Sequence, residues 1–276
     1  MTTPRDPSRA QFERGSHALY ERPRYYDHAY RAHTSDIAFY VELARHSRGP
    51  ILELGAGTGR ITRALLRAGA TVSAVDHSAA MLARARERLT RLPAAQRARA
   101  ALIRADLRKL RLGRRFDLVI APFNLFMHLY AREDIEQALD TVARHLRPNG
   151  RFALDVLMPD LGVLRRDPAR VYRCRPVFDP SDGKHYAYGE SFQYDPQRQV
   201  QTVSMLFQQL DAPEIDRTTP LCLRYFFPEE LLALLHYNGF SVVQHFGNFA
   251  GSPAGPDSEH QVIVARTRKR KGARRK

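Results

Sequence analysis

Three glycines at alternate positions stand out in the segment from Glu53 to Arg60, which reads Glu-Leu-Gly-Ala-Gly-Thr-Gly-Arg. The apolar run from Ile51 to Leu54 precedes them, and a helical pattern follows. Glycine permits a positive φ, and it lets a ligand approach the backbone because no Cβ intervenes. A glycine-rich turn between a strand and a helix is typical of a nucleotide or nucleoside site. The alternative is a tight turn that only packs.

The spacing of these glycines argues against two common nucleotide sites. The dinucleotide fingerprint is G-x-G-x-x-G, whereas here the third glycine, Gly59, comes one place earlier and Arg60 stands where that fingerprint has glycine. Hydride chemistry with NAD is therefore not favoured. The sequence also contains no G-x-x-x-x-G-K-[ST] loop, so it offers no cradle for the phosphates of ATP.

The glycine segment resembles the first motif of the class I S-adenosylmethionine-dependent methyltransferases, an acidic residue followed by G-x-G-x-G. The resemblance covers roughly residues 26–265. It continues with an acidic residue ending the second strand, Asp76, and one after the third, Asp106. Asp117 opens the fourth strand, and the R-P-N-G turn, Arg147 to Gly150, precedes the fifth. The resemblance implies S-adenosylmethionine as cofactor, with S-adenosylhomocysteine as product, and says little about the substrate.

The resemblance also implies roles for individual residues. The Asp76 carboxylate would accept both ribose hydroxyls, and its alternative role is an N-cap for the helix that begins near Ser78. Asp106, beside Leu107, would accept the adenine amino group, with helix capping as the alternative. Glu53 would order the glycine loop, whereas Asp117 lies at the wrong end of its strand for the pocket and is interpreted as structural. The implied cofactor-binding set is Tyr26, Tyr30, Glu53, Gly55, Ala56, Gly57, Gly59, Asp76, His77, Met81, Asp106, Leu107, Phe123 and Asn124.

The segment from Ala121 to His128 follows the fourth strand, where this fold places the methyl group and the substrate. It departs from the [DNS]-P-P-[YF] tetrapeptide of methyltransferases that act on nucleobase amines or protein glutamine. It is similar instead to the small-molecule branch, which includes sugar-amine and glycine-type N-methyltransferases. That resemblance implies that Phe123 packs against the cofactor, Asn124 hydrogen-bonds it and His128 takes a proton from the attacking group. The alternative for His128 is a helix residue satisfied by a backbone carbonyl.

Tyrosines crowd the first 35 residues, and Pro23 interrupts any long helix there, so we expect a loose arm. The segment resembles the arm that closes over the cofactor in this branch. Tyr30 and then Tyr26 are the expected lid residues, and Tyr30 is also a candidate catalytic residue. The alternative is ordinary aromatic packing of the arm on the core.

Short apolar runs at 51–54, 71–75, 101–105, 116–121 and 152–157 alternate with helical patterns. This rhythm predicts an α/β fold, a doubly wound Rossmann-like sheet covered on both faces. A helix over 228–237 and two final strands, 240–246 and 261–265, bring the sheet to seven strands. The expected division is an N-terminal arm or lid at 1–35, a cofactor-binding core at 36–160 and 228–265, an antiparallel β cap at 161–227 and a basic, disordered tail at 266–276.

The cap is inferred from an apolar pattern of period two between Val171 and Phe227, which predicts an antiparallel insertion after the fifth strand. Inserted there, it should roof the acceptor pocket. Topology alone makes Tyr188, Glu190 and Arg224 candidates for contact with the acceptor. An enclosed pocket favours methyl transfer to an N or O atom of a small molecule.

The formal net charge of +15 raises an alternative, because residues 266–276 carry eight basic side chains and no acidic one. A tRNA or rRNA methyltransferase could use this tail to grip phosphates, so RNA stays open as a partner. A non-catalytic partner protein that binds S-adenosylmethionine is a further alternative. The sequence says nothing about oligomeric state.

The remaining composition narrows the setting of the protein. No window approaches the roughly 18 apolar residues of a membrane span, and the start of the chain lacks a secretory signal, so we expect a cytoplasmic protein without a membrane partner. Cys174 and Cys222 have no neighbour at metal-ligand spacing and are interpreted as ordinary thiols. We therefore expect no metal site.

Overall fold

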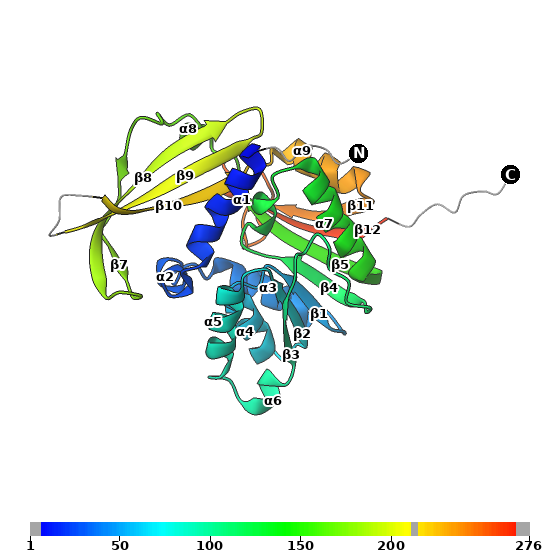
Figure 1. Ribbon diagram of the computed structural model, residues 1–276. Helices are drawn as coiled ribbons and strands as arrows, with labels where there is room; N and C mark the ends of the chain where they lie inside the picture. The colour runs from blue at the N-terminus through cyan, green and yellow to red at the C-terminus, as the bar shows by residue number, and fades with distance from the viewer. Residues whose placement is uncertain (1–6, 211–214, 269–276) are drawn as a thin grey trace.

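The central sheet has seven strands in the order β11-β12-β5-β4-β1-β2-β3 (Figure 1). The computed structural model describes residues 7–210 and 215–268. The first five strands of the sheet in sequence pair in parallel, β12 runs antiparallel to β5 and β11 runs antiparallel to β12. The doubly wound Rossmann-like prediction is confirmed. The strands are β1 (Ile51–Leu54), β2 (Val72–Asp76), β3 (Ala100–Arg104), β4 (Phe116–Ala121), β5 (Leu146–Leu157), β11 (Phe240–Phe246) and β12 (His260–Thr267).

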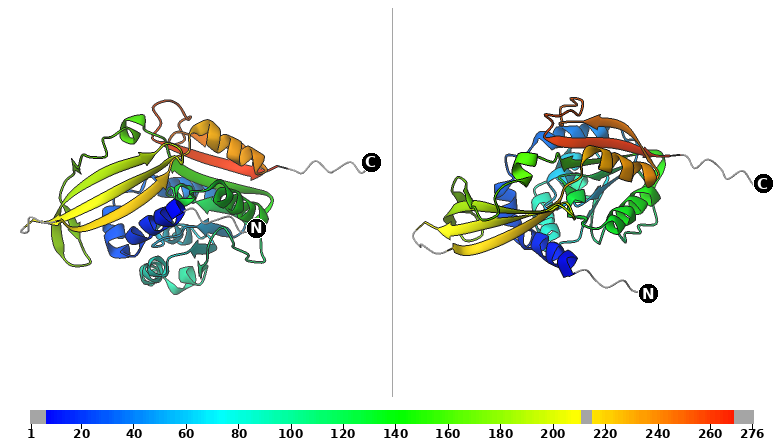
Figure 2. Two further views of the ribbon diagram at one scale, coloured as in Figure 1. Left: turned by 45° about the horizontal axis from the view of Figure 1, so that its top comes forward. Right: turned by 90° about the horizontal axis from the view of Figure 1, so that it is seen from above.

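Helices cover both faces of this sheet (Figure 2). On one face, α7 and α9 bury Leu139 and Leu235 against the strands, and on the other, α3 and α4 bury Tyr40 and Leu65. Two covered faces explain why the strands are apolar almost throughout rather than alternating. These helices are α3 (Ser35–Arg45), α4 (Arg60–Arg67), α5 (Ala79–Leu89), the short α6 (Ala94–Arg97), α7 (Arg132–His145) and α9 (Pro228–Tyr237).

The chain reverses its direction of winding between β1 and β4, which are neighbours in the sheet. The connection after β1 leads toward β2, and the chain after β4 leads toward β5 on the opposite side. In open parallel sheets a crevice forms at the carboxyl ends of the two strands at this point, and ligands bind there. The glycine segment after β1 and the segment after β4 therefore face one crevice.

The N-terminal arm consists of two helices, α1 (Pro7–Tyr20) and α2 (Pro23–Ala29). The expectation of a loose segment is thus wrong, although Pro23 does interrupt the helix. It takes the first position of α2, where its missing N–H costs no hydrogen bond. Helices this short are marginal alone, so the burial of Leu19 and Tyr25 must stabilise them.

A second, antiparallel sheet follows β5, as the period-two pattern predicts. One of its faces packs on the arm and forms the arm–cap cluster, so the arm lies against the inner face of the cap (Figure 1). The cluster consists of Leu19, Tyr25, Tyr186, Phe192, Val203, Met205 and Phe207. The elements of the cap are α8 (Leu161–Leu164), β6 (Tyr172–Arg173), β7 (Val177–Asp179), β8 (Lys184–Asp195), β9 (Val200–Gln209) and β10 (Ile215–Arg224).

The C-terminal boundary differs from the prediction. Strand β12 continues through Thr267, so the first two residues of the expected tail pair with β11 in the sheet. The next residue, Arg268, hydrogen-bonds the Nε2 atom of His236 with its side chain at 3.2 Å. The rest of the expected tail, residues 269–276, lies outside the described residues.

Two further features bear on the setting of the protein. Within residues 7–210 and 215–268, no helix has both the length and the apolar character that a membrane crossing requires. Both Cys174 and Cys222 are free thiols, as the sequence predicts.

Replacing Phe207 with alanine tests whether the arm depends on the cap. Phe207 is 1% exposed, and its ring centre lies 5.3 Å from that of Tyr25. We expect F207A to lower the free energy of unfolding by about 3–5 kcal/mol, as buried Phe-to-Ala changes do, and to speed proteolysis within α1 and α2. Val243→Ala, at a half-exposed position of β11, serves as the control for denaturant unfolding and limited proteolysis. An arm equally resistant to protease in both variants would contradict this dependence.

Candidate active site

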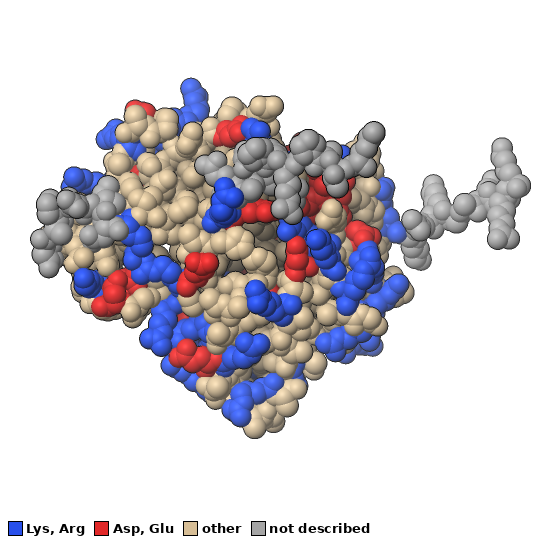
Figure 3. All heavy atoms as spheres, in the orientation of Figure 1, with Lys and Arg blue, Asp and Glu red and all other residues tan. Residues whose placement is uncertain are grey.

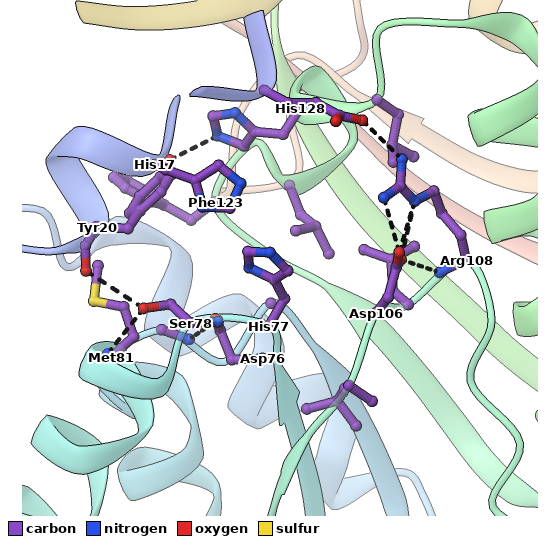
Figure 4. Close-up of a pocket in the computed structure, with 18 of the residues that line it drawn as sticks. His17, Tyr20, Asp76, His77, Ser78, Met81, Asp106, Arg108, Phe123 and His128 are labelled. Carbon is purple, nitrogen blue, oxygen red and sulfur yellow. Dashed lines mark hydrogen bonds and ion pairs between the residues drawn. The ribbon is translucent and has the colours of Figure 1, made fainter. Parts of the chain in front are cut away.

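A cavity of about 250 Å³ lies at the carboxyl edge of the sheet, at the crevice between β1 and β4 (Figure 4). The glycine loop, the ends of β2 and β3, the segment after β4 and the arm all contribute to its walls. The structure thus brings together residues from five separate segments. The predicted site residues that line it are Tyr26, Gly55, Gly57, Asp76, His77, Met81, Asp106, Leu107, Phe123 and His128.

The glycine loop presents backbone to this cavity. Gly55 and Gly57 have φ values of 67° and 55°, in the left-handed region that favours glycine. A Cβ on Gly55 would come within 2.6 Å of Leu125, whereas a Cβ on Gly57 would meet no atom within 4 Å. Gly57 therefore leaves an open space beside the backbone that a ligand can fill.

Asp76 ends β2 and joins that strand to the glycine loop. Its Oδ2 accepts a hydrogen bond from the Gly57 backbone N–H at 2.7 Å, and its Oδ1 accepts one from Ser78 at 2.8 Å. Burial raises the pKa of the carboxyl. The N-cap of α5 is Ser78, whose hydroxyl accepts from the Met81 N–H, so Asp76 is not the helix cap. Its carboxylate is left to face the cavity (Figure 4).

Asp106 has a partner that the sequence did not reveal. The Arg108 guanidinium donates to both of its carboxylate oxygens, at 2.8–3.0 Å. Arg108 also reaches Glu13 of α1 at 3.1 Å and the buried Asp134 of α7 at 2.9 Å. A ligand amino group at Asp106 would share the carboxylate with this guanidinium. Arg108 thereby connects the cavity to the arm.

His128 lies in the 3₁₀ helix η1 (Leu125–His128), and its Nε2 hydrogen-bonds the Tyr20 hydroxyl at 2.7 Å (Figure 4). Burial lowers the pKa of His128 to about 4, so the ring is neutral at physiological pH. Burial likewise raises the pKa of Tyr20. Sequence reasoning missed Tyr20, although it belongs to the crowded tyrosines of the arm. Its contact with His128 spans 108 residues of sequence.

The turn after β4 is held by a buried carboxylate. Phe123 and Asn124 both have positive φ, 58° and 63°, a conformation that costs energy for residues other than glycine. Asp155 of β5 accepts from the N–H of Phe123 at 2.9 Å and of Asn124 at 3.1 Å, and from the Tyr40 hydroxyl at 2.6 Å. Its signal in the sequence is the same as that of Asp76, an acidic residue near the end of a parallel strand.

Desolvation by burial raises the pKa of Asp155 to about 6. Above that pH the ionised carboxylate accepts hydrogen bonds on both oxygens. Protonation gives one oxygen a hydrogen of its own and removes acceptor capacity from the turn. The conformation of the turn is thereby tied to the ionisation of a single group.

Tyr30 lies outside this cavity. Its ring centre is 5.1 Å from that of Phe123 and 4.8 Å from that of Tyr26, and it lines a second cavity instead. Burial raises the pKa of Tyr30 to about 12, which leaves the hydroxyl protonated near neutral pH.

Glu53 is buried beneath the glycine loop. The Thr62 hydroxyl donates to it at 2.6 Å, and burial raises its pKa to about 8. The predicted cofactor-binding residues that do not line the first cavity are Tyr30, Glu53, Ala56, Gly59 and Asn124.

The three predicted acceptor contacts do not converge. The Tyr188 hydroxyl donates to Glu190 at 2.6 Å, and both residues lie near the middle of β8. Arg224 pairs opposite Val200 at the end of β10 and donates to Glu230 at 2.8 Å. Among the residues described as lining the first cavity, none belongs to the cap sheet, because α1 and α2 intervene.

Several lining residues went unpredicted, and most come from the arm or from loops that only the fold brings close. No cluster of three or more metal-ligating side chains occurs among residues 7–210 and 215–268. The unpredicted lining residues are Glu13, His17, Tyr20, Val75, Ser78, Ala105, Arg108, Pro122, Leu125, Leu129 and Tyr130.

Comparison with known proteins agrees with this geometry. A family model described as a methyltransferase domain matches residues 51–150, from β1 to the turn inside β5. The solved CcbJ methyltransferase from Streptomyces caelestis is 25% identical, with a TM-score of 0.74 over 86% of this chain and 90% of that one. The chain thus carries a methyltransferase domain over residues 51–150 and is similar in fold to a solved methyltransferase over most of its length.

Two relatives to which the chain is similar are N-methyltransferases by name. A dTDP-3-amino-3,6-dideoxy-α-D-glucopyranose N,N-dimethyltransferase from Streptomyces fradiae is 32% identical over 121 residues, 44% of each chain. The match therefore spans less than half the length of that relative. A glycine/sarcosine N-methyltransferase from Aphanothece halophytica is 25% identical over 84% of this chain and 82% of its own.

Asp155→Asn tests the hold on the turn after β4. The amide replaces one acceptor oxygen by an NH₂ group that faces a backbone N–H, so we expect the dissociation constant for S-adenosylhomocysteine to rise about tenfold at pH 7.5. In the unmodified chain the same constant should rise as the pH falls below about 6, whereas D155N should show no such step. Calorimetric titration from pH 5 to 8 measures both.

Asp160→Asn is the matched control for this substitution. Asp160 also accepts from two backbone N–H groups, those of Gly162 and Val163, but it caps α8 in the cap. D160N should leave the dissociation constant and its pH step unchanged. A step that persists in D155N would assign the titration to another group.

Proposed function

We propose that the protein binds S-adenosylmethionine in the first cavity and transfers its methyl group to a nitrogen atom of a small-molecule acceptor. The matched family region, residues 51–150, contains the glycine loop, Asp76, Asp106 and the turn after β4. The relatives named above act on a sugar amine and on glycine. Both acceptors present an amine, which supports nitrogen over oxygen.

The cavity residues fit the parts of the cofactor. The Asp76 carboxylate faces the cavity beside the space at Gly57, an arrangement that suits ribose hydroxyls next to an approaching backbone. Leu107 and Met81 offer apolar walls for adenine, and Asp106 offers an acceptor for its amino group. Phe123 borders the same space from the β4 side.

The protein's contribution to the chemistry is mainly positional. Bound S-adenosylmethionine supplies an activated methyl group on a sulfonium. The chain must hold the acceptor in line with that carbon, and good alignment alone gives effective molarities of about 10⁵ to 10⁸ M. The turn at Phe123 and Asn124, held by Asp155, fixes the wall nearest the reaction.

One observation in the site supports nitrogen over oxygen as the methylated atom. A hydroxyl acceptor needs a general base whose pKa lies near the working pH. The candidate base is His128, which follows the turn at Phe123 and Asn124. Its pKa of about 4 and its hydrogen bond to Tyr20 make it a poor proton acceptor. An amine that arrives neutral needs no such base. In this proposal His128 and Tyr20 orient the acceptor.

In this proposal the cap contacts only a part of the acceptor that extends past α1 and α2, because none of the described cap-sheet residues lines the first cavity. Glu190, with Tyr188 bonded to it, lies on the inner face of β8 in line with Tyr186 and Phe192 of the arm–cap cluster. A carboxylate there suits a hydroxyl or amino substituent of the acceptor away from the amine that is methylated. Arg224 has Glu230 as its partner, so we assign it to the stability of the cap rather than to the acceptor.

We also propose a cytoplasmic location, because two free thiols in the chain suit a reducing compartment. RNA remains a rival acceptor class that would use residues 266–276. Its test is salt, since phosphate contacts weaken steeply between low and moderate ionic strength. Turnover of an RNA acceptor that falls with salt and with deletion of 269–276 would favour that rival.

The proposed function is tested by following S-adenosylhomocysteine release with paired acceptors, a nucleotide-linked amino sugar and glycine against the same molecules with hydroxyl in place of amine. We expect turnover with an amine only. His128→Ala should lower kcat by less than about 100-fold, below the range of a true general base. Turnover of the hydroxyl compounds, or a larger loss in H128A, would contradict the assignment. No turnover with any acceptor, despite cofactor binding, would favour the non-catalytic partner.

Asp76→Asn tests the cofactor assignment separately. Losing charge-assisted bonds to the ribose should raise the dissociation constant for S-adenosylhomocysteine about 100-fold, at roughly 1.5–3 kcal/mol for each bond. Asp117→Asn is the matched control, because Asp117 belongs to the same motif series but pairs with Arg147 at the opposite edge of the sheet. Thermal midpoints with and without ligand measure both variants. Equal loss in the two would show a general effect of removing carboxylates.

A further inference from the structure

A second cavity, of about 280 Å³, lies between α2 and the helices α4 and α5. It shares Tyr26 with the first cavity and no other residue lining it. Thr58 of the glycine loop also borders it. The methyl-transfer mechanism uses neither this cavity nor the charged side chains around it.

Arginine dominates the walls of this second cavity. Basic side chains also gather on the surface over the junction of α2 and α5 (Figure 3). The cavity has two lining carboxylates, Asp27 and Glu87, against six arginines. The six are Arg31, Arg60, Arg63, Arg84, Arg88 and Arg91.

Half of these arginines are neutralised locally. Arg84 pairs with Asp27 at 2.7 Å and with Glu87 at 2.8 Å, and Arg88 pairs with Asp27. Arg60 makes a two-pronged pair with Asp36 at 2.6 Å. Both lining carboxylates, and Asp36 next to the cavity, are therefore already paired with one of these three guanidinium groups.

The other three remain uncompensated. Among the described residues, Arg31, Arg63 and Arg91 take part in no ion pair, and one of them, Arg63, is partly buried. Burial, followed by the charges of Arg67, Arg88 and Arg91, lowers the pKa of Arg63. Desolvation and mutual repulsion both disfavour clustered cations. An anion bound among them would stabilise their charges.

We propose that this cavity binds a small ligand through a diphosphate group, held by Arg31, Arg63 and Arg91. Guanidinium groups match phosphate oxygens with paired hydrogen bonds. Three uncompensated charges suit a diphosphate better than a single carboxylate.

Calorimetric titration of inorganic pyrophosphate into the full chain, at about 50 mM salt, tests the site. Removing two guanidinium groups should weaken binding at least tenfold in the double variant R63Q/R91Q. The matched control, R48Q/R86Q, removes two exposed arginines outside the cavity and should change binding less than about twofold. If R63Q/R91Q unfolds at lower temperature than the control, R91Q alone, at an exposed position, replaces it.

Repeating the titration with and without saturating S-adenosylhomocysteine separates this site from the first cavity. Pyrophosphate should bind in both cases, so the result stands even if S-adenosylhomocysteine does not bind. An ADP titration distinguishes the source of the group: tighter, Arg63-dependent binding of ADP points to a nucleotide, and equal binding points to the phosphates alone.

Four outcomes would overturn the site. They are an absence of pyrophosphate binding, equal weakening in both double variants, displacement of pyrophosphate by S-adenosylhomocysteine, and binding of single-stranded RNA through Arg63 and Arg91 with none of pyrophosphate.

Discussion

Burying a carboxyl group in a protein is costly unless hydrogen-bond donors surround it, and this chain places three at the carboxyl edge of its parallel sheet, with Glu53 and Asp155 buried and Asp76 partly buried. Glu53 receives the Thr62 hydroxyl, Asp76 receives two backbone N–H groups, and Asp155 receives two backbone N–H groups and the Tyr40 hydroxyl. The backbone donors belong to the loops around the first cavity, and the two hydroxyl donors belong to α3 and α4 behind them. The hydrogen bonds that these carboxyl groups need therefore hold the loops in place. The walls of the first cavity take their shape from those bonds.

The same logic extends to the arm, which is joined to the core by charges and to the cap by apolar side chains. Asp27 of α2 accepts from Thr58 in the glycine loop at 2.6 Å and pairs with Arg84 and Arg88 of α5. Leu19 and Tyr25 pack into the arm–cap cluster. The arm is thus held on two sides, and both sets of contacts keep it where it forms one wall of the first cavity.

Sequence patterns predicted the sheet, the cap and the glycine-loop half of the site because those signals are local: each strand run and each motif lies within a few residues. The Tyr20–His128 contact and the Arg108 pairs with Glu13 and Asp134 join segments 26 to 108 residues apart, so periodicity carries no trace of them. The family resemblance points to Tyr30 and Tyr26, and an arm expected to be loose gives no direction for Tyr20. Once α1 and α2 form, the position of each tyrosine around its helix decides which one reaches the cavity.

The arm–cap cluster also sets an order in time. Chains leave the ribosome from the N-terminus, at about 5–20 residues per second, and domains generally fold as units. The five parallel strands are complete by Leu157, yet Leu19 and Tyr25 pack against side chains between Tyr186 and Phe207. The first helices made are therefore among the last to dock. A nascent chain that has made only the five parallel strands still lacks the wall supplied by the arm, which docks only when the cap has been synthesised.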